Sequence, residues 1–304
     1  MGTVRVTKTK KDSKYFVLKG VKKDSIIKHN DFRHIQHERD LLYKLNNPFC
    51  IKIFGTFQDQ SNIYFALEFV PGGELFHHLN KKKSFPPAVA KFYATEIFCA
   101  IEHIQSLGYV YRDLKPENML LDVDGHVKLI DFGFARKCEV GERMHTVCGT
   151  PGYLSPEQLD GKFTNGYTNI VDWWSYGILV FELLTGYTPF VKSHSDTHYE
   201  IFLRILKNKI SFPFFFDAKS KDLIVQLCHA QLDKRLCSPE LIKDHSYYEI
   251  PWKDVVEKKL VPPITPHFKG EGDDHYFRHY QDPGMPQTDV APHTVSSKGQ
   301  FAGF

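Results

Sequence analysis

A predicted β-hairpin between two short acidic segments constrains this chain more than any other feature. The stretch 111–133 reads YRDLKPENMLLDVDGHVKLIDFG. Within it, Met119–Leu121 and His126–Ile130 are apolar or alternating runs, and the Asp-Val-Asp-Gly sequence at 122–125 is typical of a turn. The hairpin predicts that the loops on either side of it lie next to each other in space.

Those loops carry the side chains of a candidate catalytic site: Asp113, Lys115, Asn118 and Asp131. Two carboxylates, an amide and an ammonium do not build a hydrophobic core. They are suited to holding divalent cations, stabilising anionic oxygens and accepting a proton. Asp113 alone would be interpreted as an ordinary polar residue at a hairpin end, but the complete set favours a catalytic site.

Length and composition narrow the class of protein. A chain of 304 residues can bury a sizeable core and form about two domains. A net charge of +3 is too small to indicate a nucleic-acid partner. No apolar run approaches the roughly 18 residues of a membrane span. The first residues, MGTVRVTKTKK, lack the apolar core of a signal peptide, so we expect a cytoplasmic protein, with the nucleus as a second compartment.

Two kinds of metal site are rejected on spacing. The six cysteines include no Cys-x-x-Cys pair, so they are interpreted as reduced thiols rather than disulfides or a zinc site. Residues 122–125 resemble the start of an EF-hand loop, but the bidentate Glu at the twelfth position is absent.

The first seventy residues predict a small, mainly β domain with one helix. Val4–Thr9 and Tyr15–Val21 form a predicted hairpin, and a helix follows Asp31 to about Leu45. Further strands are expected over Cys50–Phe57 and Asn62–Val70.

Two charged residues of this domain form a predicted ion pair. Lys19 alone would be interpreted as an edge or solvent-facing residue of its strand. Glu38, however, interrupts the apolar face of the predicted helix. An inward carboxylate is costly unless it is paired, which favours a Lys19–Glu38 pair that orients the ammonium towards a bound anion.

The rest of the chain is predicted to be helical. Pro71-Gly-Gly73 marks the domain boundary, and a helix of about twenty residues begins at Pro86-Pro87 and ends at Gly108. Asp172 is expected to cap a buried helix that runs to Thr185. Three more helices are expected near Thr197–Lys207, Ala218–Ala230 and Pro239–His245.

These elements predict an α+β fold with a ligand cleft between its two main parts. We expect domains at 1–71 and 72–255, followed by a tail at 256–304 that is rich in Pro, Gly, Asp, His and Ser.

The chain resembles the eukaryotic Ser/Thr protein kinases, and within them the AGC group and its cAMP-dependent type. The residues that carry the resemblance are Tyr111–Asn118, Asp131–Arg136, Cys148–Pro151, Asp172–Trp174, His267–Phe277 and Phe301–Phe304. The resemblance implies a bilobal fold, with a β-rich N-lobe that lacks its first strand and a larger helical C-lobe. ATP and Mg²⁺ are the implied cofactors.

The resemblance also implies catalytic roles. Asp113 should accept the proton of the substrate hydroxyl, and Lys115 should steady the γ-phosphoryl group. Asp131 and Asn118 should bind magnesium. The implied ATP-binding residues are Val4, Val17, Lys19, Glu38, Leu67 (the gatekeeper), Glu68, Val70, Glu74, Leu120 and Phe277.

Substrate recognition and regulation are implied in the same way. Glu74, Glu117 and Glu182 should receive arginines before the target Ser or Thr, and Val147, Pro151 and Leu154 should shape an apolar pocket for the residue after it. Thr146 is the expected phosphosite, clamped by His34, Arg112 and Arg136. Glu157 should form a structural ion pair with Arg235.

The chain departs from the family pattern at several positions. Of the glycine-rich loop only Gly2 and Val4 match, so we expect either a truncated sequence or weak ATP binding. Val17 stands where Ala is usual, and Gly152 and Ser155 replace Glu and Ala. In the tail, Phe277 and Tyr280 keep positions that reach the nucleotide, and the candidate phosphosites are Thr294, Ser296 and Ser297.

Together these features predict a Ser/Thr kinase for Arg-rich substrates that is restrained by a cyclic-nucleotide-binding regulatory subunit. One alternative is a cGMP-dependent-type kinase, which would need fused cyclic-nucleotide domains. The other is a kinase-like binding protein with weak activity, favoured only by the missing glycine loop. Phosphate transfer to an Arg-Arg-x-Ser-apolar peptide, with Asp113→Asn as control, separates an active kinase from the kinase-like binding protein.

Overall fold

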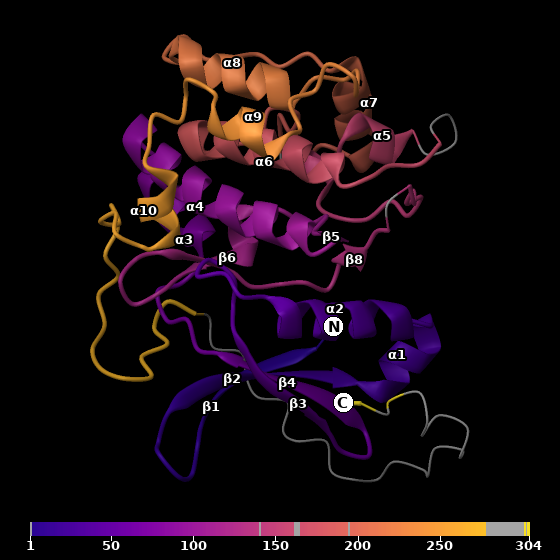
Figure 1. Ribbon diagram of the computed structural model, residues 1–304, viewed down its shortest axis with the longest axis vertical. Helices are drawn as coiled ribbons and strands as arrows, with labels where there is room; N and C mark the ends of the chain where they lie inside the picture. Colours follow the sequence, from indigo (N-terminus) through magenta and orange to yellow (C-terminus); the bar gives the residue numbers. More distant parts are fainter. Residues whose placement is uncertain (1, 140, 161–164, 194, 278–300, 302) are drawn as a thin grey trace.

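An antiparallel sheet with two helices forms the small lobe of the molecule (Figure 1). The computed structural model describes residues 2–139, 141–160, 165–193, 195–277, 301 and 303–304. The four strands of the sheet, in the order β1-β2-β4-β3, are β1 (Thr3–Lys8), β2 (Tyr15–Lys22), β4 (Asn62–Glu68) and β3 (Ile53–Gln58). Alternating and β-branched residues make the predicted β1–β2 hairpin, whose register pairs Val4 with Lys19.

Two helices pack beside this sheet. Helix α2 (Phe32–Lys44) is the predicted one, and it buries Ile35, Glu38 and Leu42 on one face. Helix α1 (Lys23–His29) was not predicted, because it follows β2 without a Gly or Pro break and is only seven residues long. Asn30 ends α1 in the left-handed conformation.

The large lobe is built around helix α6 (Ile170–Thr185), which is buried along almost its whole length because it is apolar nearly all round. Its helices are α3 (Leu75–Lys82), α4 (Pro87–Ser106), α5 (Pro156–Leu159), α6 (Ile170–Thr185), α7 (His198–Lys207), α8 (Ala218–Leu227), α9 (Pro239–Lys243) and α10 (Trp252–Val256). Helices α4 and α8 pack against α6, and Figure 1 shows these layers stacked above the small lobe. The predicted α+β fold with a small β-rich lobe and a larger helical lobe is confirmed.

Short strands and one 3₁₀ turn lie where the two lobes meet. They are β5 (Tyr109–Val110), η1 (Pro116–Asn118), β6 (Met119–Leu121), β7 (Val127–Leu129) and β8 (Arg136–Lys137). A second 3₁₀ turn, η2 (Pro151–Tyr153), packs against α6 and α7. Strands β6 and β7 form the predicted hairpin, and β5 pairs with β8.

Several sequence-based boundaries are wrong. Strand β3 begins at Ile53, because Cys50 makes only an isolated bridge to Leu129. The N-cap position of α6 is Asn169, whose side chain makes no capping hydrogen bond, and the side chain of Asp172 turns to another loop. Asp172 was predicted to be the N-cap because an Asp directly before an apolar run is typical of that position.

The end of the chain returns to the small lobe. The ring of Phe301 lies 5.2 Å from that of Phe32, and the ring of Phe304 lies 6.0 Å from that of Phe65. Gln58 donates hydrogen bonds from Nε2 to the carbonyl oxygens of both residues, at 2.9 and 3.1 Å. Tyr280 and the candidate phosphosites Thr294, Ser296 and Ser297 lie outside the described residues.

Among the residues described, no helix has the length and apolar character needed to cross a membrane.

Candidate active site

The β6–β7 hairpin brings two loops of the candidate site together. Its strands pair Met119 with Leu129 and Leu121 with Val127. Asp122 closes the turn, because its Oδ1 accepts hydrogen bonds from the backbone N–H groups of residues 124, 125 and 126. The backbone N–H of Ile130 donates to the carbonyl oxygen of Asn118 at 3.0 Å. The loops carrying Asn118 and Asp131 are therefore held side by side.

Asp113 lies at the centre of a dense polar cluster and is 5% exposed. Asn118 Nδ2 donates to Asp113 Oδ2 at 2.8 Å, and Lys115 Nζ lies 3.0 Å from the same oxygen. Thr150 Oγ1 donates to Asp113 Oδ1 at 2.8 Å and accepts a hydrogen bond from Lys115 Nζ at 2.9 Å. The prediction that these polar groups meet is confirmed. Thr150 was not singled out, although its Gly-Thr-Pro context was available as a signal.

Asp172 fixes the loop that carries Asp113. Its two carboxylate oxygens accept hydrogen bonds from the backbone N–H groups of Tyr111 and Arg112, both at 2.9 Å. Arg112 has a φ of +69°, an uncommon conformation for a residue with a side chain. The buried carboxylate of Asp172 holds this backbone in place, and sequence reasoning missed that role.

A second charged cluster joins the small lobe to the hairpin. Lys19 Nζ, on β2, lies 2.7 Å from Glu38 Oε1 on α2 and 3.1 Å from Asp131 Oδ1. Burial disfavours the ammonium, but the carboxylates of Glu38 and Asp131 outweigh it and raise the pKa of Lys19. The predicted Lys19–Glu38 ion pair is confirmed.

Asp131 and Asn118 offer oxygen ligands that fit a hard divalent cation. Burial acts against ionisation of Asp131, but the ammonium of Lys19 and the Gly133 N–H lower the pKa of its carboxyl group overall. Asn118 makes its two side-chain hydrogen bonds through Nδ2, which leaves the amide oxygen for a ligand. Ionised carboxylate and amide oxygens are the ligand types that Mg²⁺ takes.

The expected ATP-binding residues lie where the lobes join. Val17 pairs with Leu67 across β2 and β4, and Leu120 forms an isolated bridge with Glu74. Val70 and Leu67 are buried, whereas Val4 is exposed on β1. A backbone hydrogen bond joins this region to the β6–β7 hairpin: the N–H of residue 72 donates to the carbonyl oxygen of residue 121 at 2.9 Å.

Two other expected ATP-binding residues, Glu68 and Phe277, are far apart in the sequence. Glu68 Oε2 accepts a hydrogen bond from Lys128 Nζ at 3.1 Å, which ties the end of β4 to β7. Phe277, in the tail, is half-buried and packs against the main hydrophobic core.

The candidate substrate carboxylates lie in contrasting settings. Glu74 precedes α3 as its N-cap residue, while Glu117 lies in η1 and Glu182 in α6. Burial, together with the negative charge of Glu117, raises the pKa of Glu182 to about 8. Burial raises the pKa of Glu117 as well. Oε2 of Glu182 is buried without a hydrogen-bond partner among the described residues, so this carboxyl group is available to a cationic ligand.

The expected apolar pocket involves residues of unequal exposure. Leu154 is buried, Pro151 is half-buried at the start of η2, and Val147 is exposed.

Thr146 is exposed beside a cavity of about 440 Å³ between α2 and the loop after Asp131. His34, Arg112 and Thr146 all line this cavity. Arg112 donates from Nε to the carbonyl oxygen of Phe134 and from Nη1 to Tyr167. Arg136 does not line the cavity, and its guanidinium pairs with Glu142 at 2.5 Å.

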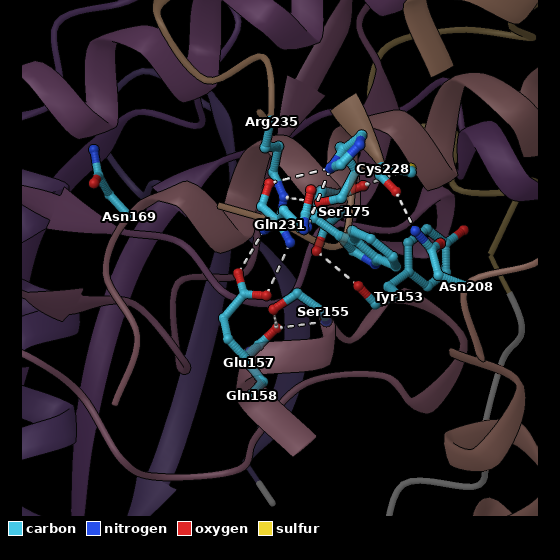
Figure 2. A network of polar contacts seen from close by, with 12 residues as sticks. Tyr153, Ser155, Glu157, Gln158, Asn169, Ser175, Asn208, Cys228, Gln231 and Arg235 are labelled. Carbon is cyan, nitrogen blue, oxygen red and sulfur yellow. Dashed lines mark hydrogen bonds and ion pairs between the residues drawn. The ribbon is translucent and has the colours of Figure 1, made fainter. Parts of the chain in front are cut away.

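Glu157 and Arg235 form the predicted buried ion pair, which Figure 2 shows at the centre of a polar network. The pair is bidentate, with N–O distances of 2.5 and 2.9 Å. Arg235 also donates from Nε to the carbonyl oxygen of His229. Close to this ion pair, the backbone N–H and the hydroxyl of Ser155 both donate to Gln158 Oε1. These hydrogen bonds join the N-cap residue of α5 to the first turn of that helix.

Comparisons with known proteins agree with this geometry. Residues 1–248 match the model of the protein kinase domain. The chain is 42% identical to the cAMP-dependent protein kinase catalytic subunit PRKX of Mus musculus, over 94% of this chain and 80% of that protein. It is 38% identical to the cAMP-dependent protein kinase type 3 of Saccharomyces cerevisiae, over 92% of this chain and 70% of that protein.

A relative with a different family name is nearly as similar. The RAC family serine/threonine-protein kinase homolog of Dictyostelium discoideum is 40% identical over 90% of this chain and 61% of that protein. From the domain match, the relatives and the site geometry together, the chain belongs to the protein kinase family and is a serine/threonine kinase of the AGC group.

Proposed function

We propose that this kinase is of the cAMP-dependent type and transfers the γ-phosphate of ATP to Ser or Thr in Arg-rich proteins. The observation that carries this proposal is the pair of clusters on either side of the β6–β7 hairpin. Asp113 with Lys115 faces Thr150, while Lys19 with Glu38 reaches Asp131. Relatives over most of the chain are named as catalytic subunits of cAMP-dependent kinases.

Each side chain has a distinct task in this proposal. Asp113 accepts the proton of the substrate hydroxyl, because its carboxylate is held by Asn118 and Thr150 at a fixed orientation. Lys115, 3.0 Å from Asp113, offsets negative charge on the transferred phosphoryl group. Lys19, oriented by Glu38, binds phosphate oxygens of ATP.

Mg²⁺ held by Asp131 and Asn118 would neutralise charge on the phosphates when bound. The adenine ring is proposed to lie between Val17 and Leu120, next to the backbone of Glu68 and Val70. Leu67 and Phe277 then border the nucleotide, with Val4 covering it from β1.

Substrate preference follows from the carboxylates. Burial and the nearby charge of Glu117 raise the pKa of Glu182, so a bound guanidinium would relieve the repulsion between the two carboxylates. Glu74 completes the acidic set. Val147, Pro151 and Leu154 receive an apolar residue after the phosphoacceptor.

Regulation is proposed to act through Thr146 and a partner. A phosphate on Thr146 would add charge at a cavity edge lined by His34 and Arg112, and would compete with Glu142 for Arg136. A cyclic-nucleotide-binding regulatory subunit is the proposed inhibitor, by analogy with the named relatives. The domain boundaries we propose remain 1–71, 72–255 and 256–304.

A peptide series tests the substrate preference. The kinase should phosphorylate Arg-Arg-Ala-Ser-Ile with a much lower KM than Ala-Ala-Ala-Ser-Ile, and should leave the Tyr counterpart unmodified. Equal KM values for the first two peptides would contradict the Arg-directed proposal. If the folded protein phosphorylated neither Ser peptide, that result would contradict the proposed activity itself.

A further inference from the structure

An unusual aromatic segment joins α7 to α8. Residues 212–216 read Phe-Pro-Phe-Phe-Phe. The rings of Phe212 and Phe216 pack against that of Phe181 on α6, at 5.9 and 5.4 Å between centroids. Phe214, by contrast, is fully exposed, and Phe215 is 57% exposed. Two anchored rings therefore hold two neighbouring rings in solvent.

A cavity of about 340 Å³ lies directly beside these exposed rings. Phe215 and Phe216 line one part of it, and residues 84–87 with Leu184 line the other. The second wall is fixed to α6, because the N–H of Phe85 donates to the carbonyl oxygen of Leu183 at 2.9 Å. The cavity is large enough for an apolar side chain of a partner.

The segments that lead into this cavity carry lysines. Lys81, Lys82 and Lys83 are all exposed and come directly before the lining residue Ser84. Lys221 places its ammonium 5.6 Å from the centroid of the Phe212 ring. Within the part of the chain that the structure describes, none of these four lysines forms an ion pair with a carboxylate.

Among the described residues, Asp217 is the one carboxylate that lines the cavity, and it is already engaged. Asp217 caps α8, where its side chain accepts hydrogen bonds from the backbone N–H and the hydroxyl of Ser220. An acidic partner would therefore meet lysines at the rim and no free carboxylate in the wall.

From this combination we propose that the surface formed by residues 81–87, Leu184 and 212–217 is a docking site for a partner protein, outside the active site. Its occupant is a short peptide segment with an aromatic or leucine anchor flanked by Asp and Glu. The apolar anchor fills the cavity against Phe215 and Phe216, with Phe214 exposed beside them, and the acidic residues face the lysines. A second copy of this chain is disfavoured, because a two-fold contact would set the same lysines against each other.

The test measures the binding of a fluorescein-labelled peptide, Glu-Asp-Phe-Glu-Asp-Leu-Phe-Glu, by anisotropy. One control peptide has Lys in place of every acidic residue, and a second has Ser in place of every apolar residue. The protein variants are Phe214→Ser with Phe215→Ser, and Lys82→Glu with Lys83→Glu. The matched control is Leu241→Ser, which removes an exposed apolar side chain on α9.

The acidic aromatic peptide should bind, and both control peptides should bind far more weakly. The double Phe variant should bind this peptide with a Kd at least about ten-fold higher than that of the wild type. The lysine variant should also bind it more weakly, and the loss should be larger at low salt than at high salt. Leu241→Ser should leave the Kd unchanged. Phosphorylation of Arg-Arg-Ala-Ser-Ile should be the same in the wild type and the double Phe variant, so this site is tested separately from the activity.

Three outcomes would overturn the proposal. The first is peptide binding that the double Phe variant does not weaken, and the second is a preference for the lysine peptide. The third is another occupant: concentration-dependent dimerisation in sedimentation, or binding to anionic vesicles, that is lost in Phe214→Ser while the acidic peptide fails to bind.

Discussion

Thr150 donates a hydrogen bond from its hydroxyl to Oδ1 of Asp113 at 2.8 Å and accepts one from Lys115. Thr150 lies four residues after Thr146, on the same loop. The position of that loop therefore affects how the Asp113–Lys115 pair is oriented.

Replacement of Thr150 by valine tests this connection. Val keeps the shape of Thr but removes the hydroxyl, so Asp113 loses one of its orienting hydrogen bonds. A hydrogen bond to a charged group contributes about 1.5–3 kcal/mol. We expect kcat to fall about 10- to 100-fold while the KM for ATP changes little. Thr150→Ser, which keeps the hydroxyl, should stay close to wild type, and a similar loss in both variants would argue against the hydrogen bond.

Replacement of Glu38 by glutamine tests the orientation of Lys19. Without the carboxylate, Lys19 keeps Asp131 as its one charged partner within the part of the chain that the structure describes. We expect kcat/KM for ATP to fall about 10- to 100-fold, since small misplacements of a phosphate-binding group are costly. Asp40→Asn, on the same helix, removes an exposed carboxylate paired with Arg39 and serves as the control. Equal losses in the two variants would contradict a specific role for Glu38.

The protonation of Glu182 predicts a pH dependence of substrate binding. Burial and the charge of Glu117 raise its pKa to about 8, so at pH 7 the carboxyl group is mostly neutral without substrate. A guanidinium needs the ionised form. The KM for Arg-Arg-Ala-Ser-Ile should therefore fall as pH rises from 6.5 to 8, by up to about ten-fold per pH unit, and level off above 8. A matched peptide without the arginines should show no such trend.

The same group predicts a pH dependence of stability with a defined sign. The folded pKa of Glu182 is raised above the ordinary 4.5, so the fold favours its neutral form. Stability is lost as pH rises from about 4.5 through about 8. Glu182→Gln removes this loss, so its melting temperature relative to wild type should increase between pH 5 and pH 9. A constant difference across this range would show that Glu182 does not titrate there.

The buried pair Glu157–Arg235 predicts a large effect on stability. Glu157→Gln leaves the Arg235 guanidinium buried without its carboxylate. Removing one partner of a buried pair costs about 3–5 kcal/mol. The exposed pair Lys219–Glu249 provides the control, because Lys219→Met should cost less than about 1 kcal/mol. Urea unfolding of both variants measures the difference, and similar free energies of unfolding would refute the assignment.

Local sequence patterns predicted the parts of the site that depend on short-range structure. The turn at 122–125 gave the β6–β7 hairpin, and the inward position of Glu38 on α2 gave its pair with Lys19. In both cases periodicity and turn chemistry decide the geometry within about twenty residues.

Long-range hydrogen bonds escaped the same reasoning. Asp172 precedes an apolar run and resembles a cap, but it accepts hydrogen bonds from a loop 60 residues earlier in the chain. Thr150 reaches Asp113 across 37 residues. Neither contact follows from the periodicity or the turn chemistry of the residues around it.

The most direct test is transfer of ³²P from γ-labelled ATP to Arg-Arg-Ala-Ser-Ile in the presence of Mg²⁺, by wild type and by Asp113→Asn. Asn keeps the shape of Asp113 but does not accept a proton at neutral pH. We predict that the wild type labels the serine and that Asp113→Asn loses at least about 99% of the rate while retaining the wild-type melting temperature. Equal labelling by the two proteins, or no labelling by folded wild type, would contradict the account.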